Sequence, residues 1–139
     1  MSAKAISEYT GKELLYKQLD KLHFLDKPHA VPINENENFE NATEKSEWLR
    51  DPSAKGVIKP DQLIKRRGKH GLVKIGTQHE LAKWFNENKG QYKQVGKTTG
   101  RLTNFIVEPF VAHTEKEELY VAIYSLRDCD VVMFYEEGV

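Results

Sequence analysis

The stretch GVIKPDQLIKRRGKHGLVKIGT at residues 56–77 places a strongly basic segment between two short apolar runs. The runs at 56–59 and 71–75 have the composition of strands, and Pro60 ends the first of them. Seven lysines and arginines and one aspartate fall between Lys55 and Ile75, a net charge of +6. We therefore predict a strand, a basic loop and a second strand.

A helix is expected directly after this stretch. Thr77 and Glu80 have the T-x-x-E spacing of a capping box, and apolar residues then repeat at helical spacing. Gly90 is expected to end the helix in the left-handed conformation. The apolar stripe comprises Leu81, Trp84 and Phe85.

Further strands and helices are predicted on both sides. Strands are expected at 92–95, at 104–107 before Pro109, and at 118–125 and 130–135. On the N-terminal side, a helix is expected over residues 7–22 with Ser7 as its N-cap, and a short helix over 44–50. The long helix would present an apolar face of Leu14, Leu15, Leu19 and Leu22.

The Asn- and Glu-rich residues 34–45 have strong turn chemistry and little to bury, so we predict a surface loop there. The order of helices and strands indicates an α+β protein with a mixed or antiparallel sheet and helices packed on one face. A chain of 139 residues is expected to form a single domain, residues 1–139.

Composition excludes several classes of protein. The chain has 21 basic and 21 acidic residues, which excludes a uniformly basic coat of the kind found on ribosomal proteins. The longest apolar run, residues 119–124, is too short to cross a bilayer. Cys129 is the only cysteine, and the polar start lacks a signal peptide, so we expect a cytosolic protein without a membrane partner.

The basic loop at 65–71 is a candidate anion site. Arginine forks and lysine point charges suit phosphate oxygens, and Gly68 and Gly71 would let the backbone approach a ligand closely. Nucleic-acid binding, a localisation signal and a solvated surface are the alternatives. Nucleic-acid binding would favour aromatic residues among the cations, and residues 55–75 contain none.

A second candidate segment is Glu108 to Val111, followed seven residues later by Glu118. A strand that runs into a proline leaves backbone groups unpaired, and such groups can recognise the edge of a purine beside an apolar wall. Glu118 is either a ribose ligand or one of several carboxylates on an acidic surface, and Glu108 is open to the same two interpretations.

These segments together resemble the ATP-citrate lyase (ATP-citrate synthase) family of the ATP-grasp superfamily. The resemblance covers residues 1–17 and about 56–139, with its motifs at 57–73, 95–100 and 104–111, whereas residues 18–55 do not match. It implies the N-terminal part of an ATP-grasp module. In that family ATP phosphorylates a histidine, the phosphoryl group passes to citrate, and CoA then yields citryl-CoA, which is cleaved to acetyl-CoA and oxaloacetate.

The resemblance also implies roles for particular residues. Lys59 and the run Arg66, Arg67 and Gly68 would hold the ATP phosphates. Pro109 and Val111 would contact the adenine through their backbone, and Glu118 would bind the ribose.

It implies that the catalytic histidine, the Mg²⁺ ligands and the citrate and CoA sites lie beyond residue 139. We therefore expect an inactive, monomeric piece of a homotetrameric enzyme, with no catalytic residue and no metal ligand of its own. Two alternatives stay open. One is the β subunit of a succinyl-CoA-type ligase, whose loop reads G-G-R-G-K-x-G-G rather than KRRGKHGL. The other is a non-catalytic module that binds RNA or another anion.

Overall fold

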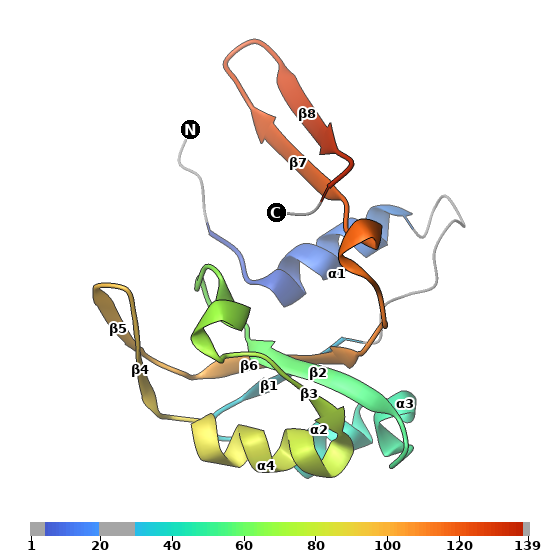
Figure 1. Cartoon of the computed structure of the whole chain (residues 1–139), viewed down its shortest axis with the longest axis vertical. Helices are drawn as coiled ribbons and strands as arrows, with labels where there is room; N and C mark the ends of the chain where they lie inside the picture. Colours follow the sequence, from blue (N-terminus) through green and yellow to red (C-terminus); the bar gives the residue numbers. More distant parts are fainter. Residues whose placement is uncertain (1–4, 20–29, 138–139) are drawn as a thin grey trace.

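The computed structural model describes residues 5–19 and 30–137. Its centre is a four-stranded sheet in the order β1 (Val31–Asn34), β6 (Asn104–Pro109), β2 (Lys55–Pro60) and β3 (Lys74–Thr77). Every neighbouring pair is antiparallel (Figure 1). The edge strands are therefore β1, which contains Pro32, and β3.

The two central strands alternate between a core face and an opposite face. Ile58 of β2 pairs with Val107 of β6, and both are buried in the hydrophobic core. Val57 pairs with Glu108 one residue away, and their side chains point to the other face, since successive side chains of a strand alternate. Lys59 lies on the same face as Glu108. The sheet thus separates the core from a charged surface.

Three helices cover the core face: α2 (Phe39–Glu44), α3 (Glu47–Arg50) and α4 (Gln78–Asn88) (Figure 1). The rings of Phe39 and Phe85 lie 6.1 Å apart, and those of Phe85 and Phe105 lie 5.2 Å apart, edge to face. Such pairs add to the stability gained from burial alone. The predicted α+β architecture with an antiparallel sheet is confirmed.

Helix α4 has the ends that the sequence predicts. The Thr77 N–H donates to the Glu80 carboxylate at 2.8 Å, which is half of the predicted capping box. At the other end, Gly90 has φ of 73° and its N–H donates to the carbonyl of Leu102 at 2.8 Å.

Helix α1 (Glu8–Leu19) lies on the other side of the sheet from α4 (Figure 1). Ser7 is its N-cap as predicted, because the Thr10 N–H donates to Ser7 Oγ at 3.2 Å. The predicted apolar face is not buried: Leu14 is 52% exposed and Leu15 is 56% exposed. Leu22 lies outside the described residues. Polar contacts at its first turn, rather than apolar packing, hold α1 on the sheet.

Two elements between α1 and β2 differ from the prediction. The surface loop predicted at 34–45 is wrong over its second half, because Phe39–Glu44 form α2 and bury Phe39 and Ala42. Strand β1 was not predicted either. The loop prediction failed because a single aromatic ring, Phe39, is enough to anchor a helical turn in an Asn- and Glu-rich segment when a core lies beneath it. Strand β1 is only four residues long and contains Pro32, which locally argues against a strand.

The strand predicted at 71–75 begins later, at Lys74. Residues Arg67–His70, which lie in the predicted basic loop, form a 3₁₀ turn. Gly71, the first residue of the predicted strand, caps this turn with φ of 65°. The predicted strand at 56–59 extends over β2, and Pro60 is its last residue.

Two hairpins complete the described chain. Strands β4 (Tyr92–Val95) and β5 (Thr98–Arg101) form one, and β7 (Tyr120–Ser125) and β8 (Asp130–Tyr135) form the other. The β7–β8 hairpin extends away from the four-stranded sheet (Figure 1). Within the described ranges, no helix has the length and apolar character that a bilayer span requires.

Candidate functional site

A cavity of about 950 Å³ lies on the face of the sheet opposite the core. Its floor includes Val57 and Lys59 of β2 and Ile75 of β3. One wall is residues 64–68, which include the first part of the basic loop, and the other is the segment 108–111 together with His113. Two segments that are far apart in the sequence therefore line one cavity.

The basic loop is shaped by its own backbone. Arg66 has φ of 55° and ψ of 41°, and it is the one non-glycine residue with positive φ in the described part of the chain. That conformation is uncommon for a side chain of this size and marks a constrained turn. The turn closes through hydrogen bonds from Lys69 N–H to the Arg66 carbonyl and from Leu72 N–H to the Arg67 carbonyl, each 3.0 Å.

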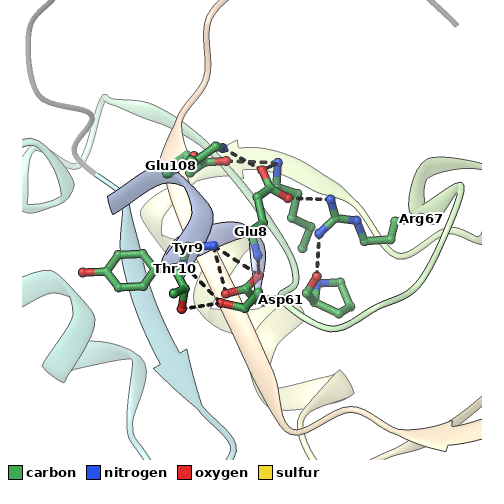
Figure 2. Close-up of polar contacts among 10 residues, drawn as sticks. Glu8, Tyr9, Thr10, Asp61, Arg67 and Glu108 are labelled. Carbon is green, nitrogen blue, oxygen red and sulfur yellow. Dashed lines mark hydrogen bonds and ion pairs between the residues drawn. The ribbon is translucent and has the colours of Figure 1, made fainter. Parts of the chain in front are cut away.

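Five charged side chains form a network at the edge of the cavity, which we call the charge network. Lys59 Nζ lies 2.7 Å from Glu8 Oε1 and 3.0 Å from Glu108 Oε2. Lys12 Nζ pairs with the same two carboxylates, and Arg67 pairs with the other oxygen of Glu8 (Figure 2). The members are Glu8, Lys12, Lys59, Arg67 and Glu108. Three cations against two carboxylates leave a net charge of +1.

Arg67 is fixed at two points. One guanidinium nitrogen donates to the Pro60 carbonyl at 2.7 Å, and the other pairs with Glu8 (Figure 2). Pro60 is the last residue of β2, so the loop that begins there is tied back to its own strand. This contact sets the direction in which the guanidinium faces the cavity.

Glu8 is held in turn by the residue that follows Pro60. The carboxylate of Asp61 accepts hydrogen bonds from the backbone N–H groups of Glu8, at 2.7 Å, and Tyr9, at 3.2 Å (Figure 2). These are orphan donors at the start of α1, where a negative charge is also favoured by the helix dipole. Burial alone would raise the pKa of Glu8, but hydrogen bonds from Lys12, Lys59 and Arg67 lower the pKa to about 2. Glu8 is therefore ionised at neutral pH.

A smaller set of polar contacts, centred on His113, lies at the opposite wall of the cavity. His113 lines the cavity, and its ring nitrogens lie 2.8 Å from the Val111 carbonyl and 3.1 Å from Glu118 Oε1. The contact with the Val111 carbonyl, followed by that with Glu118, raises the pKa of His113 above its ordinary value.

The residues predicted from the sequence are brought together with one exception. Six of the seven line the cavity: Lys59, Arg66, Arg67, Gly68, Pro109 and Val111. Glu118 is not among the lining residues that the structure describes; it reaches the cavity wall only through His113. No role of these residues is tested by their position alone, so the roles stay predictions.

Sequence reasoning missed three members of the site. Glu8 and Lys12 were not considered as site residues, although their i, i+4 spacing on a helix is a recognised ion-pair signal. His113 was not among the predicted site residues either. The long-range contacts that give these residues their importance cannot be inferred from local spacing.

The arrangement suits a ligand with two different ends. The cationic loop and Lys59 offer donors to an anionic group, while Pro109, Phe110 and Val111 offer an apolar wall with backbone groups. Among residues 5–19 and 30–137, no cluster of three or more histidine, cysteine, aspartate or glutamate side chains is placed to hold a metal ion.

Comparison with known proteins identifies relatives over nearly the whole chain. A family model described as the ATP-citrate synthase ATP-grasp domain matches residues 2–139. A probable ATP-citrate synthase of Caenorhabditis elegans is 59% identical over 99% of this chain, and the human ATP-citrate synthase is 47% identical over 99% of it. The chain spans 12% of the length of each of these relatives.

A solved structure has the same fold. The ATP citrate lyase of Methanothrix soehngenii, in complex with citrate and coenzyme A, superposes with a TM-score of 0.82 at 32% identity. The superposition covers 99% of this chain and 33% of that one. The expectation that residues 18–55 do not match the family was wrong, because the family model spans residues 2–139.

Proposed function

The chain belongs to the ATP-citrate synthase ATP-grasp domain family, and from this membership we propose that it is the ATP-binding part of an ATP-citrate synthase. The whole enzyme would convert citrate, CoA and ATP to acetyl-CoA, oxaloacetate, ADP and phosphate. This chain would supply part of the nucleotide site and would not turn over by itself.

One observation carries the proposal. The basic loop and the proline-edged segment 108–111, separated by about 40 residues of sequence, line the same cavity. A nucleoside triphosphate has a polyanionic end and a flat base. Its phosphates would contact the cationic wall while its base contacts the proline-edged wall. Phosphoryl transfer depends chiefly on positioning and charge stabilisation, which cations on a rigid strand and a constrained loop are suited to provide.

The roles within the site follow from the chemistry of each wall. Lys59 and Arg67 would donate to phosphate oxygens, with Gly68 allowing the backbone to come close and Arg66 adding charge. Pro109 and Val111 would present backbone groups to the adenine edge. Glu118 would act at the ribose, and its hydrogen bond to His113 places its carboxylate near the cavity wall.

The proposal also covers properties that belong to the whole enzyme. Citrate and CoA would bind elsewhere in the enzyme, as they are present in the complex of the Methanothrix protein. Mg²⁺ would accompany the ATP, but we assign no residue of this chain to it. A homotetramer in the cytosol, with no nucleic-acid or membrane partner, completes the proposal.

Titration of this chain with ATP tests the proposal. We expect weak but saturable binding, followed by NMR through the amide signals of the loop at 65–71, and a Kd about tenfold higher for Lys59→Ala because one charge-assisted contact is lost. Lys93→Ala, on β4 and outside the cavity, is the matched control. No binding of ATP, or equal binding by Lys59→Ala, would contradict the proposal.

A parallel titration with random-sequence RNA separates the remaining alternative. Electrostatic binding to RNA weakens steeply with salt because counterions are released. RNA binding that persists at 0.15 M salt while ATP fails to bind would favour a nucleic-acid module instead.

A further inference from the structure

Glu8 contacts the cations of the proposed ATP site without belonging to the cavity itself. It pairs with Lys59 and Arg67, both of which line the cavity, but Glu8 is not among the lining residues within the described ranges. The carboxylate therefore approaches these cations from the side of α1. A ligand in the cavity would meet the same two cations from another direction.

The contacts with Glu8 leave donors for such a ligand. An ammonium has three donors, and Lys59 pairs with two carboxylates, those of Glu8 and Glu108. A guanidinium has five N–H donors, and Arg67 directs one nitrogen to the Pro60 carbonyl and another to Glu8. These contacts fix the orientation of both side chains without using every donor they possess.

Fixing two flexible cations next to each other costs free energy, and a carboxylate that contacts both can offset it. Lysine and arginine side chains lose rotamer entropy when they are fixed, and like charges repel. The two oxygens of Glu8 contact different cations, Oε1 with Lys59 and Oε2 with Arg67, so that one anion sets the spacing between them. A site that is ordered before the ligand arrives binds more tightly, because that cost is not part of binding.

Asp61 fixes Glu8 in the same way that Glu8 fixes the cations. Its carboxylate is buried and accepts the backbone N–H groups of Glu8 and Tyr9. Because α1 has no buried side chain, this polar contact is an important constraint on where α1 begins. The order of contacts is Asp61, then Glu8, then Lys59 and Arg67. Figure 2 shows Asp61, Glu8 and Arg67 in this order.

We propose that Glu8 is a positioning residue of the nucleotide site: anchored by Asp61, its carboxylate holds Lys59 and Arg67 at the spacing that the phosphate chain of ATP requires. The inference rests on the proposed ATP site. It assigns a role in nucleotide binding to the first turn of α1, where Glu8 lies 59 residues before Arg67 in the chain.

The test compares ATP with AMP in four forms of this chain: wild type, Glu8→Gln, Glu8→Asp and the control Glu13→Gln on the same helix. Glu8→Gln removes the charge, and Glu8→Asp keeps the charge but shortens its reach by one methylene. We expect both to raise the Kd for ATP about tenfold and to change the Kd for AMP less than twofold. AMP keeps the base and ribose, so a general folding defect would weaken both ligands.

The most decisive contrary result would be tighter binding of ATP by Glu8→Gln than by the wild type. If Glu8 merely neutralises the site, Glu8→Gln leaves a more positive cavity and ATP binds more tightly than to the wild type. Tighter or unchanged ATP binding by Glu8→Gln would overturn the inference. Absence of ATP binding by the wild type is a different outcome, because it overturns the proposed function first.

A second pair of variants keeps the inference testable if Glu8→Gln does not fold. Asp61→Asn retains an oxygen that accepts the Glu8 N–H, whereas Asp61→Ala does not. We expect Asp61→Ala to weaken ATP binding and Asp61→Asn to restore most of the wild-type affinity. Equal affinity in the two variants would count against Glu8 as a positioning residue.

Discussion

The carboxylate of Asp61 accepts a 2.7 Å hydrogen bond from the backbone N–H of Glu8, which lies 53 residues earlier in the chain. This bond joins the start of α1 to the residue that follows β2. The segment that leads to the basic loop at 65–71 begins at the same point, and Arg67 of that loop donates to the Pro60 carbonyl, so one short segment holds both the helix and the loop. The site is assembled by polar contacts around residues 59–61 rather than by a hydrophobic interface.

Acid should weaken folding partly through Glu8. Its pKa is lowered in the folded state from 4.5 to about 2, so its contribution to the free energy of unfolding is present above pH 4.5 and is lost as the pH falls toward 2. Urea unfolding at pH 7 and pH 3 should show a loss that is about 2 kcal/mol larger for the wild type than for Glu8→Gln. Equal losses in the two proteins would contradict this assignment of the Glu8 pKa.

Arg67 should not be replaceable by lysine. Its guanidinium contacts the Pro60 carbonyl and the Glu8 carboxylate through different nitrogens, a geometry that a single ammonium reproduces poorly. We expect both Arg67→Lys and Arg67→Ala to raise the Kd for ATP by about five- to tenfold, measured by the same NMR titration. Lys69→Ala, in the same loop but outside the lining of the cavity, serves as the control. Wild-type affinity in Arg67→Lys would show that charge alone is sufficient.

Gly56 should tolerate no side chain. A Cβ there would lie 2.9 Å from atoms of Leu81 and Trp48 and 3.1 Å from the Glu108 carbonyl oxygen, so α3 and α4 would have to move away from β2. We expect Gly56→Ala to lower the free energy of unfolding by about 2 kcal/mol, measured by urea titration. Gly100→Ala is the matched control, since a Cβ at that strand position has no neighbour within 4 Å. Equal effects at the two glycines would show that the helices are not packed this closely.

His113 should titrate above its ordinary range. Contacts with the Val111 carbonyl and with Glu118 favour the protonated ring and raise the pKa of His113 above 6.5. An NMR titration of the ring protons should give a midpoint above that value in the wild type and a lower midpoint in Glu118→Gln. Identical midpoints would mean that Glu118 does not contact the ring in solution.

Local signals predicted the elements that local interactions form. The capping box of Thr77 and Glu80, the left-handed Gly90 and the N-cap Ser7 were all recognisable, because each depends on residues within one turn. The prolines at 60 and 109 likewise marked the ends of β2 and β6.

Elements and contacts that depend on tertiary packing could not be predicted from local sequence. Helix α2 forms because Phe39 is buried in the core. The polar residues around Phe39 in the sequence give no sign of this burial. Leu14 and Leu15 belong to the apolar stripe predicted for α1, but no residue in the described part of the chain buries them. In the candidate site, the cations and the proline-edged wall were predicted, whereas Glu8 and His113 were not, because their contacts depend on the tertiary arrangement.

Pro32 gives the sheet a defined boundary. It lies in β1, the edge strand beside β6, and a proline has no N–H to offer to an incoming strand. An extended peptide, or the same strand of another molecule, would find an interrupted ladder along this edge. Proline on an edge strand is a known protection against edge-to-edge pairing of sheets from different molecules. Replacing Pro32 with valine would therefore promote aggregation without changing the lining of the cavity.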